Sequence, residues 1–390
     1  MILVLTDPIR DVLPRLLADA GTRDALTNLA RAHRTGEHVV HGTTALLIRL
    51  AEARELPEDV RGTFRQIRQR HHEAAALRAC VSHLCEIEPD DGDVREEGDD
   101  AQRRFRVPLS WFGDLGRAAR ARLVAEHAND ARIYARAGEA HLSRNGPRGV
   151  QMRVETHGGG GSTTAEAFRD HARHAPTLCI LDADFKWSAQ EGAPVEGETA
   201  ARVRRFAREV AGDAVCGVHV VPCREIENLF PAAVVRACLM REDSHRFVAQ
   251  CELAADLGLF GGGPDVNRMD LKGGLCRRDW ERLEGPRRRY LARLYECTRG
   301  SVPPPPRGFC DAERRCPDSD EAQCAKPCAC VIFDGLGDAF LGRVTEMLAL
   351  LSAQKVAEHL LVAGQPSEPL WAEVGRLVFS WGCAYPRARV

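Results

Sequence analysis

Long apolar runs are missing from this chain of 390 residues. No stretch reaches the roughly 18 apolar residues that a membrane-spanning helix requires, so we expect no contact with a membrane. The first residues, MILVLTDPIRDVL, place only five apolar residues before the first charge and contain no small-residue cleavage site, which argues against a secretory signal. We therefore expect a cytoplasmic protein.

An excess of charge of one sign is also missing. The formal net charge is −2, so the overall charge neither favours nor excludes binding to nucleic acid, and only local clusters of charge are informative. The chain also contains no internal repeat. What is present is a hydrophobic fraction of 44%, which is ample for the cores of about two or three domains.

Three regions of the chain differ in pattern. Residues 1–110 space their apolar residues as helices do after a short opening strand, and residues 86–100 hold nine acids against one arginine, which indicates a boundary. Residues 116–240 alternate strands with helices, and residues 241–390 are helical apart from a Pro- and Cys-rich insertion at 297–330. We expect the first region to be a helical module that recognises a substrate or a partner.

The middle region predicts an α/β fold. Its expected strands are "RLVAEH", "GVQMRVETH", "TLCILDAD" and "AVCGVHVVP", with helical segments between them. Strands that alternate with helices form a mostly parallel sheet, and nearly continuous apolar strands indicate that helices cover both faces. We therefore expect an α/β protein with a mostly parallel sheet flanked by helices, a helical N-terminal region and a helical, Cys-rich C-terminal region.

Acidic residues follow the ends of these strands. In open α/β sheets the functional site lies beyond the carboxyl ends of the strands. Gathering carboxylates there costs free energy unless a cation is bound, and oxygen ligands of this kind suit Mg²⁺ or Mn²⁺. The sequence therefore predicts a metal site formed by six carboxylates: Glu126, Asp130, Asp182, Asp184, Glu225 and Glu227.

The backbone conformation decides whether neighbouring acids can act together. Asp182 and Asp184 should share one face of their strand, because side chains alternate with a period of two. Glu225 and Glu227 would diverge by about 200° on a helix, so both can be ligands only where their segment is extended or begins a helix.

The order of these motifs resembles a Toprim domain, which is shared by topoisomerases, bacterial primases, a ribosomal-RNA maturation nuclease and the OLD-family nucleases. Glu126 follows a strand, a glycine loop comes next, and then "DAD" at 182–184. The Glu126–Asp130 spacing and "REIENLF" at 224–230 resemble the OLD and phage-defence branch. His127 stands where topoisomerases and primases favour glycine, and Lys186 stands where topoisomerases have a third aspartate.

This resemblance covers about residues 118–235, and the chain contains no Walker A motif of an ATPase. It implies two-metal hydrolysis of nucleic-acid phosphodiesters, by an endonuclease rather than an exonuclease, that serves bacterial anti-phage defence with a partner ATPase or sensor encoded in the same operon. Glu126, Asp130, Asp182 and Asp184 would hold the first metal, with Asp182 bridging. Glu225 and Glu227 would help to hold the second, and Lys272 would serve catalysis.

The glycine loop in "HGGGGSTTAEAF" at 157–168 has two interpretations. It lacks the Gly-Lys-Ser/Thr ending of a phosphate-binding loop, so it is either a tight turn or a bare backbone that phosphate or metal can approach. "TTAE" at 163–166 has the form of a capping box for the next helix. Candidate cations for a nucleic-acid backbone lie elsewhere, at Lys186, Arg277, Arg278, Arg287, Arg288 and Arg289.

A cluster of cysteines predicts a structural Zn²⁺ site. A short segment without a core of its own needs a metal to hold it, and we expect four ligands from the cluster. The cluster consists of Cys310, Cys316, Cys324, Cys328 and Cys330. The alternative is a set of unpaired thiols or disulfides formed during purification.

Two other functions fit the same residues. The first alternative to a nuclease is a primase-like nucleotidyl transferase on the same domain. The second is a non-catalytic Toprim-like sensor or scaffold that works with a partner ATPase. The sequence leaves open whether the substrate is DNA or RNA and whether the protein is a homo-oligomer.

Overall fold

The computed structural model describes residues 1–89, 92–99, 101–184, 197–241, 243–263, 266–276, 294–295 and 331–387. The chain forms two compact units. Unit 1 contains Met1–Leu181, Ala201–His219 and Ala372–Val390, and unit 2 contains Asp182–Ala200 and Val220–Trp371. This division differs from the three consecutive regions expected from the sequence, because the chain leaves unit 1 and returns to it twice.

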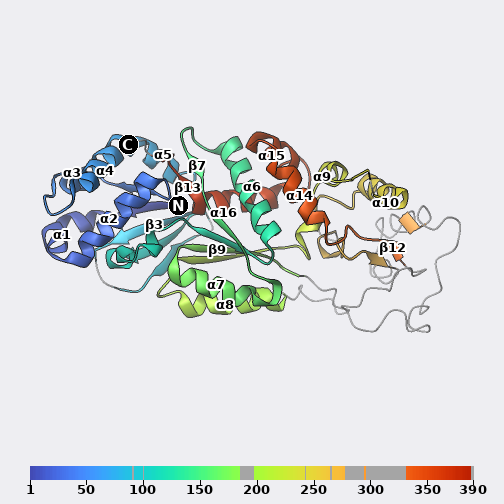
Figure 1. The fold of residues 1–390 in the computed structure, drawn as a ribbon, viewed down its shortest axis with the longest axis horizontal. Helices are drawn as coiled ribbons and strands as arrows, with labels where there is room; N and C mark the ends of the chain where they lie inside the picture. Colours follow the sequence, from blue (N-terminus) through green and yellow to red (C-terminus); the bar gives the residue numbers. More distant parts are fainter. Residues whose placement is uncertain are drawn as a thin grey trace. The chain divides into compact units, whose positions relative to one another are not determined.

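The N-terminal part of unit 1 contains a five-stranded sheet in the order β2-β1-β3-β5-β4. Figure 1 labels its strand β3. The strands are β1 (Ile2–Leu5), β2 (Val39–Gly42), β3 (His83–Glu88), β4 (Arg95–Gly98) and β5 (Arg103–Pro108). β1 runs parallel to β2 and β3, β3 runs parallel to β5, and β4 is antiparallel to β5. The helices are α1 (Asp7–Ala18), α2 (Ala20–Thr35), α3 (Thr44–Glu52), α4 (Glu58–Gln69) and α5 (His71–Arg78), followed by the 3₁₀ turns η1 (Leu109–Gly113) and η2 (Gly116–Ala118).

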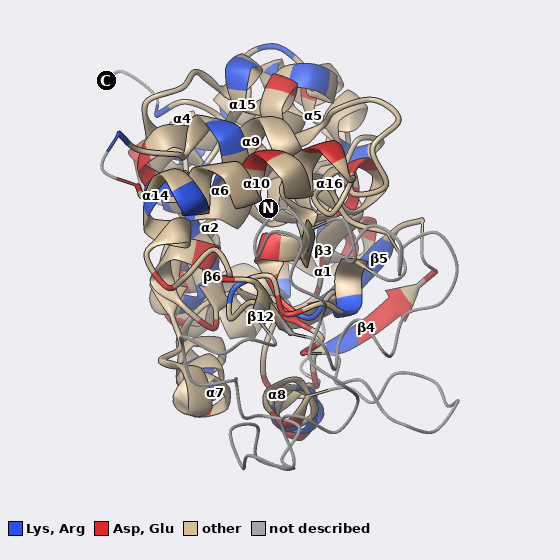
Figure 2. Cartoon of the chain, turned by 90° about the vertical axis from the view of Figure 1, so that its right-hand side faces the viewer, with Lys and Arg blue, Asp and Glu red and all other residues tan. Residues whose placement is uncertain are grey.

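This sheet corrects the expectation that residues 1–110 are a helical module. Residues 86–100 were predicted to be a linker, yet they contain the end of β3 and the edge strand β4, whose charged residues are coloured in Figure 2. Their charges are paired across strands: Arg103 lies 3.1 Å from Glu96, and Arg106 lies 2.7 Å from Glu97. Opposite charges on facing strands stabilise a pair that is too polar for a buried strand.

The second sheet has four strands in the order β10-β9-β6-β8. They are β6 (Arg122–Ala125), β8 (Glu155–Gly158), β9 (Thr177–Asp182) and β10 (Cys216–Val221). β6 runs parallel to both β8 and β9. The intervening segments are α6 (Ala128–Asn145), the turn η3 (Gly161–Thr163), α7 (Thr164–His174) and α8 (Glu198–Val210). Helix α6 packs on β6 and β8, and α7 packs on β6. The predicted α/β class, with parallel strands flanked by helices, is confirmed.

The C-terminal segment of the chain completes the core of unit 1. Helix α16 (Glu368–Gly382) ends there and is followed by β13 (Cys383–Ala384), which pairs antiparallel with β7 (Gln151–Met152). One expected strand, at 149–157, is therefore two strands in two different sheets. Phe379, Cys383 and Tyr385 belong to the same apolar cluster as Ile2 and Leu84.

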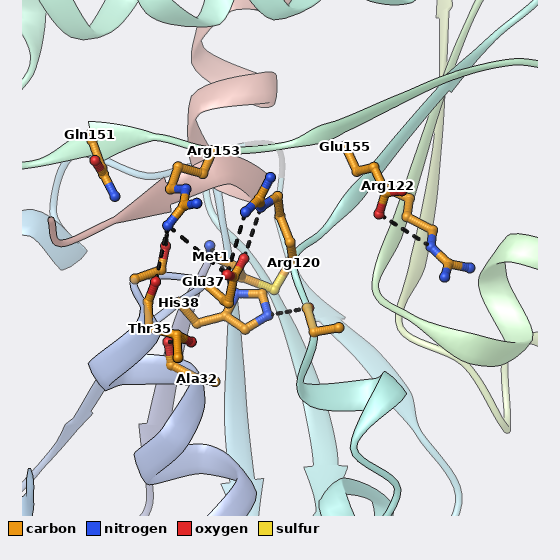
Figure 3. Close-up of polar contacts among 12 residues, drawn as sticks. Met1, Ala32, Thr35, Glu37, His38, Arg120, Arg122, Gln151, Arg153 and Glu155 are labelled. Carbon is orange, nitrogen blue, oxygen red and sulfur yellow. Dashed lines mark hydrogen bonds and ion pairs between the residues drawn. The ribbon is translucent and has the colours of Figure 1, made fainter. Parts of the chain in front are cut away.

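Hydrogen bonds reinforce this junction, and Figure 3 shows the group around Met1. The buried Met1 amino group donates to the carbonyl oxygens of Trp381 and Cys383 at 2.9 and 2.8 Å. Nearby, Arg120 Nε lies 2.8 Å from Glu37 Oε2, and His38 Nε2 lies 2.7 Å from the carbonyl oxygen of Ala119. Backbone groups, His38 and the ion pairs of Glu37 with Arg120 and Arg153 thus satisfy the polar atoms where the two ends of unit 1 meet.

Unit 2 is mainly helical in the residues that the structure describes. Its elements are the turn η4 (Ile226–Leu229), α9 (Ala232–Ala237), α10 (His245–Asp256), the turn η5 (Val266–Arg268), α14 (Phe340–Ala349), α15 (Ala353–Leu360) and the antiparallel pair β11 (Leu275–Cys276) and β12 (Val331–Phe333). Trp371 Nε1 donates to the carbonyl oxygen of Leu229 at 3.0 Å. In neither unit is any described helix both long and apolar enough to cross a membrane.

The packing of α16 on α6 gives a testable prediction. A methyl group added at Gly375 would lie 2.8 Å from the carbonyl oxygen of Ala137, whereas one added at Gly62, in α4, would meet nothing within 4 Å. We expect Gly375→Ala to lower the free energy of unfolding by about 1–3 kcal/mol, because backbone has to move. Gly62→Ala should raise it by about 0.5–1 kcal/mol. Denaturant titrations of both variants measure this difference, and equal effects would contradict the close packing.

A buried histidine predicts a response to acid. His33 Nδ1 accepts the amide of Val40 at 3.1 Å, and burial, with Arg70 nearby, lowers the pKa of His33 to about 4 from 6.5. The unfolded state therefore binds more protons between pH 6.5 and pH 4, and stability falls as the pH is lowered through that window.

The corresponding variant is His33→Gln, which keeps a hydrogen-bond acceptor but does not titrate. Between pH 7 and pH 5 it should lose about 1–2 kcal/mol less unfolding free energy than the wild type does. Urea titrations at the two pH values provide the measurement. Parallel losses in both proteins would show that His33 is not held neutral.

Candidate functional site

The acidic residues predicted near β6 lie in unit 1. Glu126 follows β6 directly, and its carbonyl oxygen accepts the amides of Gly160 and Gly161 at 3.1 and 3.2 Å. Asp130 is buried in the first turn of α6, and its Oδ2 accepts the amide of His127 at 3.1 Å. Asp130 therefore caps a helix in this structure, which engages one of the two oxygens that the sequence assigned to a metal.

The glycine loop is a tight turn of unit 1. Gly160 and Gly161 have φ values of 78° and 66°, which favour glycine, and a methyl group at Gly159 would lie 2.5 Å from Thr164. The expected capping box is wrong, because the Thr163 hydroxyl donates to the carbonyl oxygen of Gly159 at 2.7 Å and forms no cap hydrogen bond. Of the two interpretations of the loop, this geometry supports the tight turn.

The acidic residues at the ends of β9 and β10 lie in unit 2, and three of them interact. Asp182 Oδ2 accepts the amide of Ile226 at 2.7 Å, which ties the end of β9 to the segment after β10. Glu225 has an extended backbone with φ −145°, and Glu227 lies two residues further along in a 3₁₀ turn. This is the conformation in which both glutamates can serve one site, as the sequence required.

Burial and mutual repulsion shift the ionisation of these glutamates. Burial, followed by repulsion from Asp270, raises the pKa of Glu225 to about 7. Burial raises the pKa of Glu227 well above its usual value, and the negative charges of Glu225 and Asp182 add to the rise. The three carboxyl groups are therefore close enough for each negative charge to make the next one unfavourable.

Glu227 is the least compensated group of this set. Its side chain is 1% exposed, and its Oε1 has no hydrogen-bond partner among the residues that the structure describes. A buried carboxylate oxygen without a donor is costly, so it must carry a proton or meet a cation. The donor set, all carboxylate oxygen, suits a hard divalent cation.

Lys272 lies beside these acids, as the sequence predicted for a catalytic lysine. Its backbone amide approaches Glu225 Oε2 at 3.4 Å, and its Nζ lies 3.5 Å from Asp338 Oδ1. Burial lowers the pKa of Lys272, but the negative charges of Glu227, Glu225 and Asp338 outweigh it, so the pKa is raised. Lys272 therefore stays a cation.

Two residues of this site escaped the sequence interpretation. Asn228 is fully buried; its Oδ1 accepts the amide of Glu225 at 3.0 Å and its Nδ2 donates to the carbonyl oxygens of Val266 and Met269. Asp270 lies 3.0 Å from Arg224. Their closeness in sequence to predicted site residues could have identified them: Asn228 follows Glu227, and Asp270 precedes Lys272 by two residues.

Asp184 does not behave as the sequence predicted. β9 ends at Asp182, and Asp184 is the one non-glycine residue with a positive φ, 47°, among the described residues. The strand alternation that would place Asp182 and Asp184 on one face therefore stops before Asp184. Asp184 is exposed.

The described residues contain no group of three or more His, Cys, Asp or Glu side chains arranged to hold a metal ion. Glu126 and Asp130 belong to unit 1, whereas Asp182, Asp184, Glu225, Glu227 and Lys272 belong to unit 2. Several predicted residues lie outside the described part of the chain: the cations Lys186, Arg277, Arg278, Arg287, Arg288 and Arg289, and the zinc candidates Cys310, Cys316, Cys324, Cys328 and Cys330.

Comparisons with known proteins found no matching family model, no matching curated protein and no matching solved structure.

The uncompensated Glu227 predicts a metal-dependent change in stability. Without a divalent cation, Glu227→Gln should raise the free energy of unfolding by about 1–3 kcal/mol, because the amide cannot ionise in a buried site. With millimolar Mn²⁺ the wild type should gain melting temperature and the variant should not. Thermal unfolding with Mn²⁺ and with EDTA tests both statements.

Glu252→Gln is the matched control, because Glu252 is an exposed glutamate of the same unit, paired with Arg236. This control should stay within about 0.5 kcal/mol of the wild type and keep the response to Mn²⁺. A Glu227→Gln protein that is clearly less stable than the wild type in EDTA would mean that the carboxylate has a partner.

Proposed function

We propose that the chain is a nuclease that uses Mg²⁺ or Mn²⁺ to hydrolyse nucleic-acid phosphodiesters. The observation that carries the proposal is Glu227 Oε1, a buried carboxylate oxygen without a partner among the described residues, within electrostatic range of Glu225 and Asp182. The order of the acidic motifs, which resembles the Toprim nucleases of the OLD and phage-defence branch, gives this site its reaction. A role in anti-phage defence with a partner ATPase or sensor follows from the same resemblance.

In this proposal the acids of unit 2 bind the cation, and the neighbouring Asn228 positions one of them. Asp182, Glu225 and Glu227 are not arranged as a set of three ligands in this structure, and their side chains would have to converge to hold the cation. When bound, the cation would activate a water molecule and stabilise charge on the phosphate oxygens. Asn228 fixes the backbone of Glu225 through its amide, and so positions the carboxylate. The resemblance assigns Glu126, Asp130 and Asp184 to the same reaction, and these assignments remain predictions.

Lys272 supplies the positive charge that the reaction needs. The negative charges of Glu227, Glu225 and Asp338 keep its pKa raised, so it is protonated at neutral pH. A fixed cation beside a phosphate offsets the negative charge that grows on the oxygens in the transition state. Arg224 is already paired with Asp270 at 3.0 Å, so we assign it a structural role in the site rather than contact with the substrate.

Cleavage assays with one conservative variant test the proposal. The wild type should cut at least one of plasmid DNA, single-stranded DNA or total tRNA with Mn²⁺ and none with EDTA. Asp182→Asn should reduce the cleavage rate by about 100-fold or more, because the amide is a poor ligand for a divalent cation.

Asp256→Asn is the control, since Asp256 is an exposed aspartate of unit 2 that pairs with Arg236 at 2.7 Å. It should cleave at the wild-type rate. Cleavage that persists in EDTA, or an Asp182→Asn protein as active as the wild type, would refute the nuclease. The same reactions with labelled nucleotides distinguish a nucleotidyl transferase, and binding of Mn²⁺ without any cleavage would favour a sensor or scaffold.

A further inference from the structure

Unit 1 contains a cavity of about 830 Å³ that plays no part in the proposed nuclease. Its walls come from the five-stranded sheet, from β10, from α8 and from α16, and every lining residue belongs to unit 1. β10 is an edge strand of its sheet. A cavity of this volume is in the range that small-molecule ligands occupy.

Arginines dominate the charge of the cavity. Four line it, Arg103, Arg204, Arg208 and Arg376, against two acids, Glu96 and Glu373. Arg103 pairs with Glu96 at 3.1 Å, and Glu373 lies 3.9 Å from His219. Within the described part of the chain, neither Arg208 nor Arg376 forms an ion pair, so their guanidinium groups are available to an anion.

The inner wall of the cavity is apolar and aromatic. Phe105 and Leu178 line it and are buried, and the ring of His83 lies 6.3 Å from that of Phe105. Gly217 also lines the cavity, and a side chain there would meet the ring of Trp381 at 2.9 Å. The cavity therefore combines four arginines with the half-buried ring of His83, which a flat ligand can contact.

Burial and the nearby arginines lower the pKa values of the two histidines that line the cavity. Burial, with help from Arg103 and Arg376, lowers the pKa of His83 to about 4. The pKa of His219 is also lowered, first by burial and further by Arg204, although Glu373 opposes this. Both rings are therefore neutral at pH 7, and the remaining positive charge belongs to the arginines.

We propose that this cavity binds a free nucleotide, with its phosphates on Arg208 and Arg376 and its base against the half-buried His83. Guanidinium groups recognise phosphate oxygens through paired N–H donors, which suits two arginines that line one cavity and form no ion pair among the described residues. A simple anion would leave the aromatic wall unused, and an apolar ligand would leave the arginines without a partner. A nucleotide satisfies both surfaces.

Calorimetry on the full chain in EDTA tests the proposal, because EDTA removes any contribution from a metal bound at the carboxylates. The probes are ATP and GTP, with pyrophosphate as the phosphate alone and adenosine as the base alone. We expect at least one of the two nucleotides to bind with a stoichiometry of one. Pyrophosphate should bind about tenfold or more weakly, and adenosine more weakly than the nucleotide.

The decisive variants are Arg208→Ala and Arg376→Ala, which should each weaken nucleotide binding by about tenfold or more. Arg205→Ala is the matched control: Arg205 is on α8 like Arg208, but it pairs with Glu209 at 3.8 Å and does not line the cavity. It should bind as the wild type does. Thermal unfolding without ligand confirms that each variant is folded.

Failure of this proposal is separate from failure of the nuclease. No binding of ATP or GTP at millimolar concentration, or equal binding by the Arg208, Arg376 and Arg205 variants, would overturn it. Pyrophosphate binding as tight as that of ATP and GTP would also overturn it, since the aromatic wall would then contribute nothing. Loss of cleavage in Asp182→Asn with nucleotide binding intact would support two separate sites.

Discussion

The Trp381 side chain joins the two sheets of unit 1. Its ring lies 5.6 Å from Phe105 in β5 and 6.1 Å from His83 in β3, and it occupies the space that a side chain at Gly217 in β10 would need. The adjacent Ser380 hydroxyl accepts the amide of Ser82 at 2.8 Å. A residue near the end of the chain thereby orders strands from three earlier segments. Gly217 also lines the cavity beside β10, and its missing side chain lets the Trp381 ring pack closely against that strand.

A different constraint organises unit 2, namely the burial of negative charge. Glu227 is almost fully buried, and its neighbours Glu225 and Asp182 make its ionisation less favourable. The surrounding polar groups compensate this charge only in part: Asn228 donates to backbone carbonyl oxygens, and Lys272, which favours the ionised form of Glu227, also holds Asp338 at 3.5 Å. Structures retain such a group only when something outside the chain completes it, or when a proton does. A cation bound at Glu227 would favour a metal-dependent enzyme, whereas a permanently protonated Glu227 would favour a scaffold.

The sequence predicted those parts of the fold whose signal is local. The apolar runs of β6, β9 and β10 and the helices between them follow from periodicity, and so does the α/β class. It failed at β4, whose charges resemble a solvated linker until Arg103 and Arg106 of β5 are known to face them. Asp184 was misplaced because a left-handed backbone at an aspartate leaves no trace in the pattern "DAD". The pairing of β13 with β7, and the position of Trp381, depend on contacts between residues far apart in the chain, which no window of sequence contains.

The two candidate sites would bind a phosphate group in different ways, one through a divalent cation and the other directly through arginines. Carboxylates repel it, so at Asp182, Glu225 and Glu227 a divalent cation has to bind before a nucleic-acid backbone can approach. Arg208 and Arg376, which form no ion pair among the described residues, would attract a phosphate directly, and no metal is needed for that. On the two proposals, divalent cations would therefore control the first site and would have no role in the second. If both proposals hold, the protein would bind a nucleotide even without divalent cations, when it could not cut a nucleic acid. The two proposals are independent, but both concern the recognition of phosphate groups.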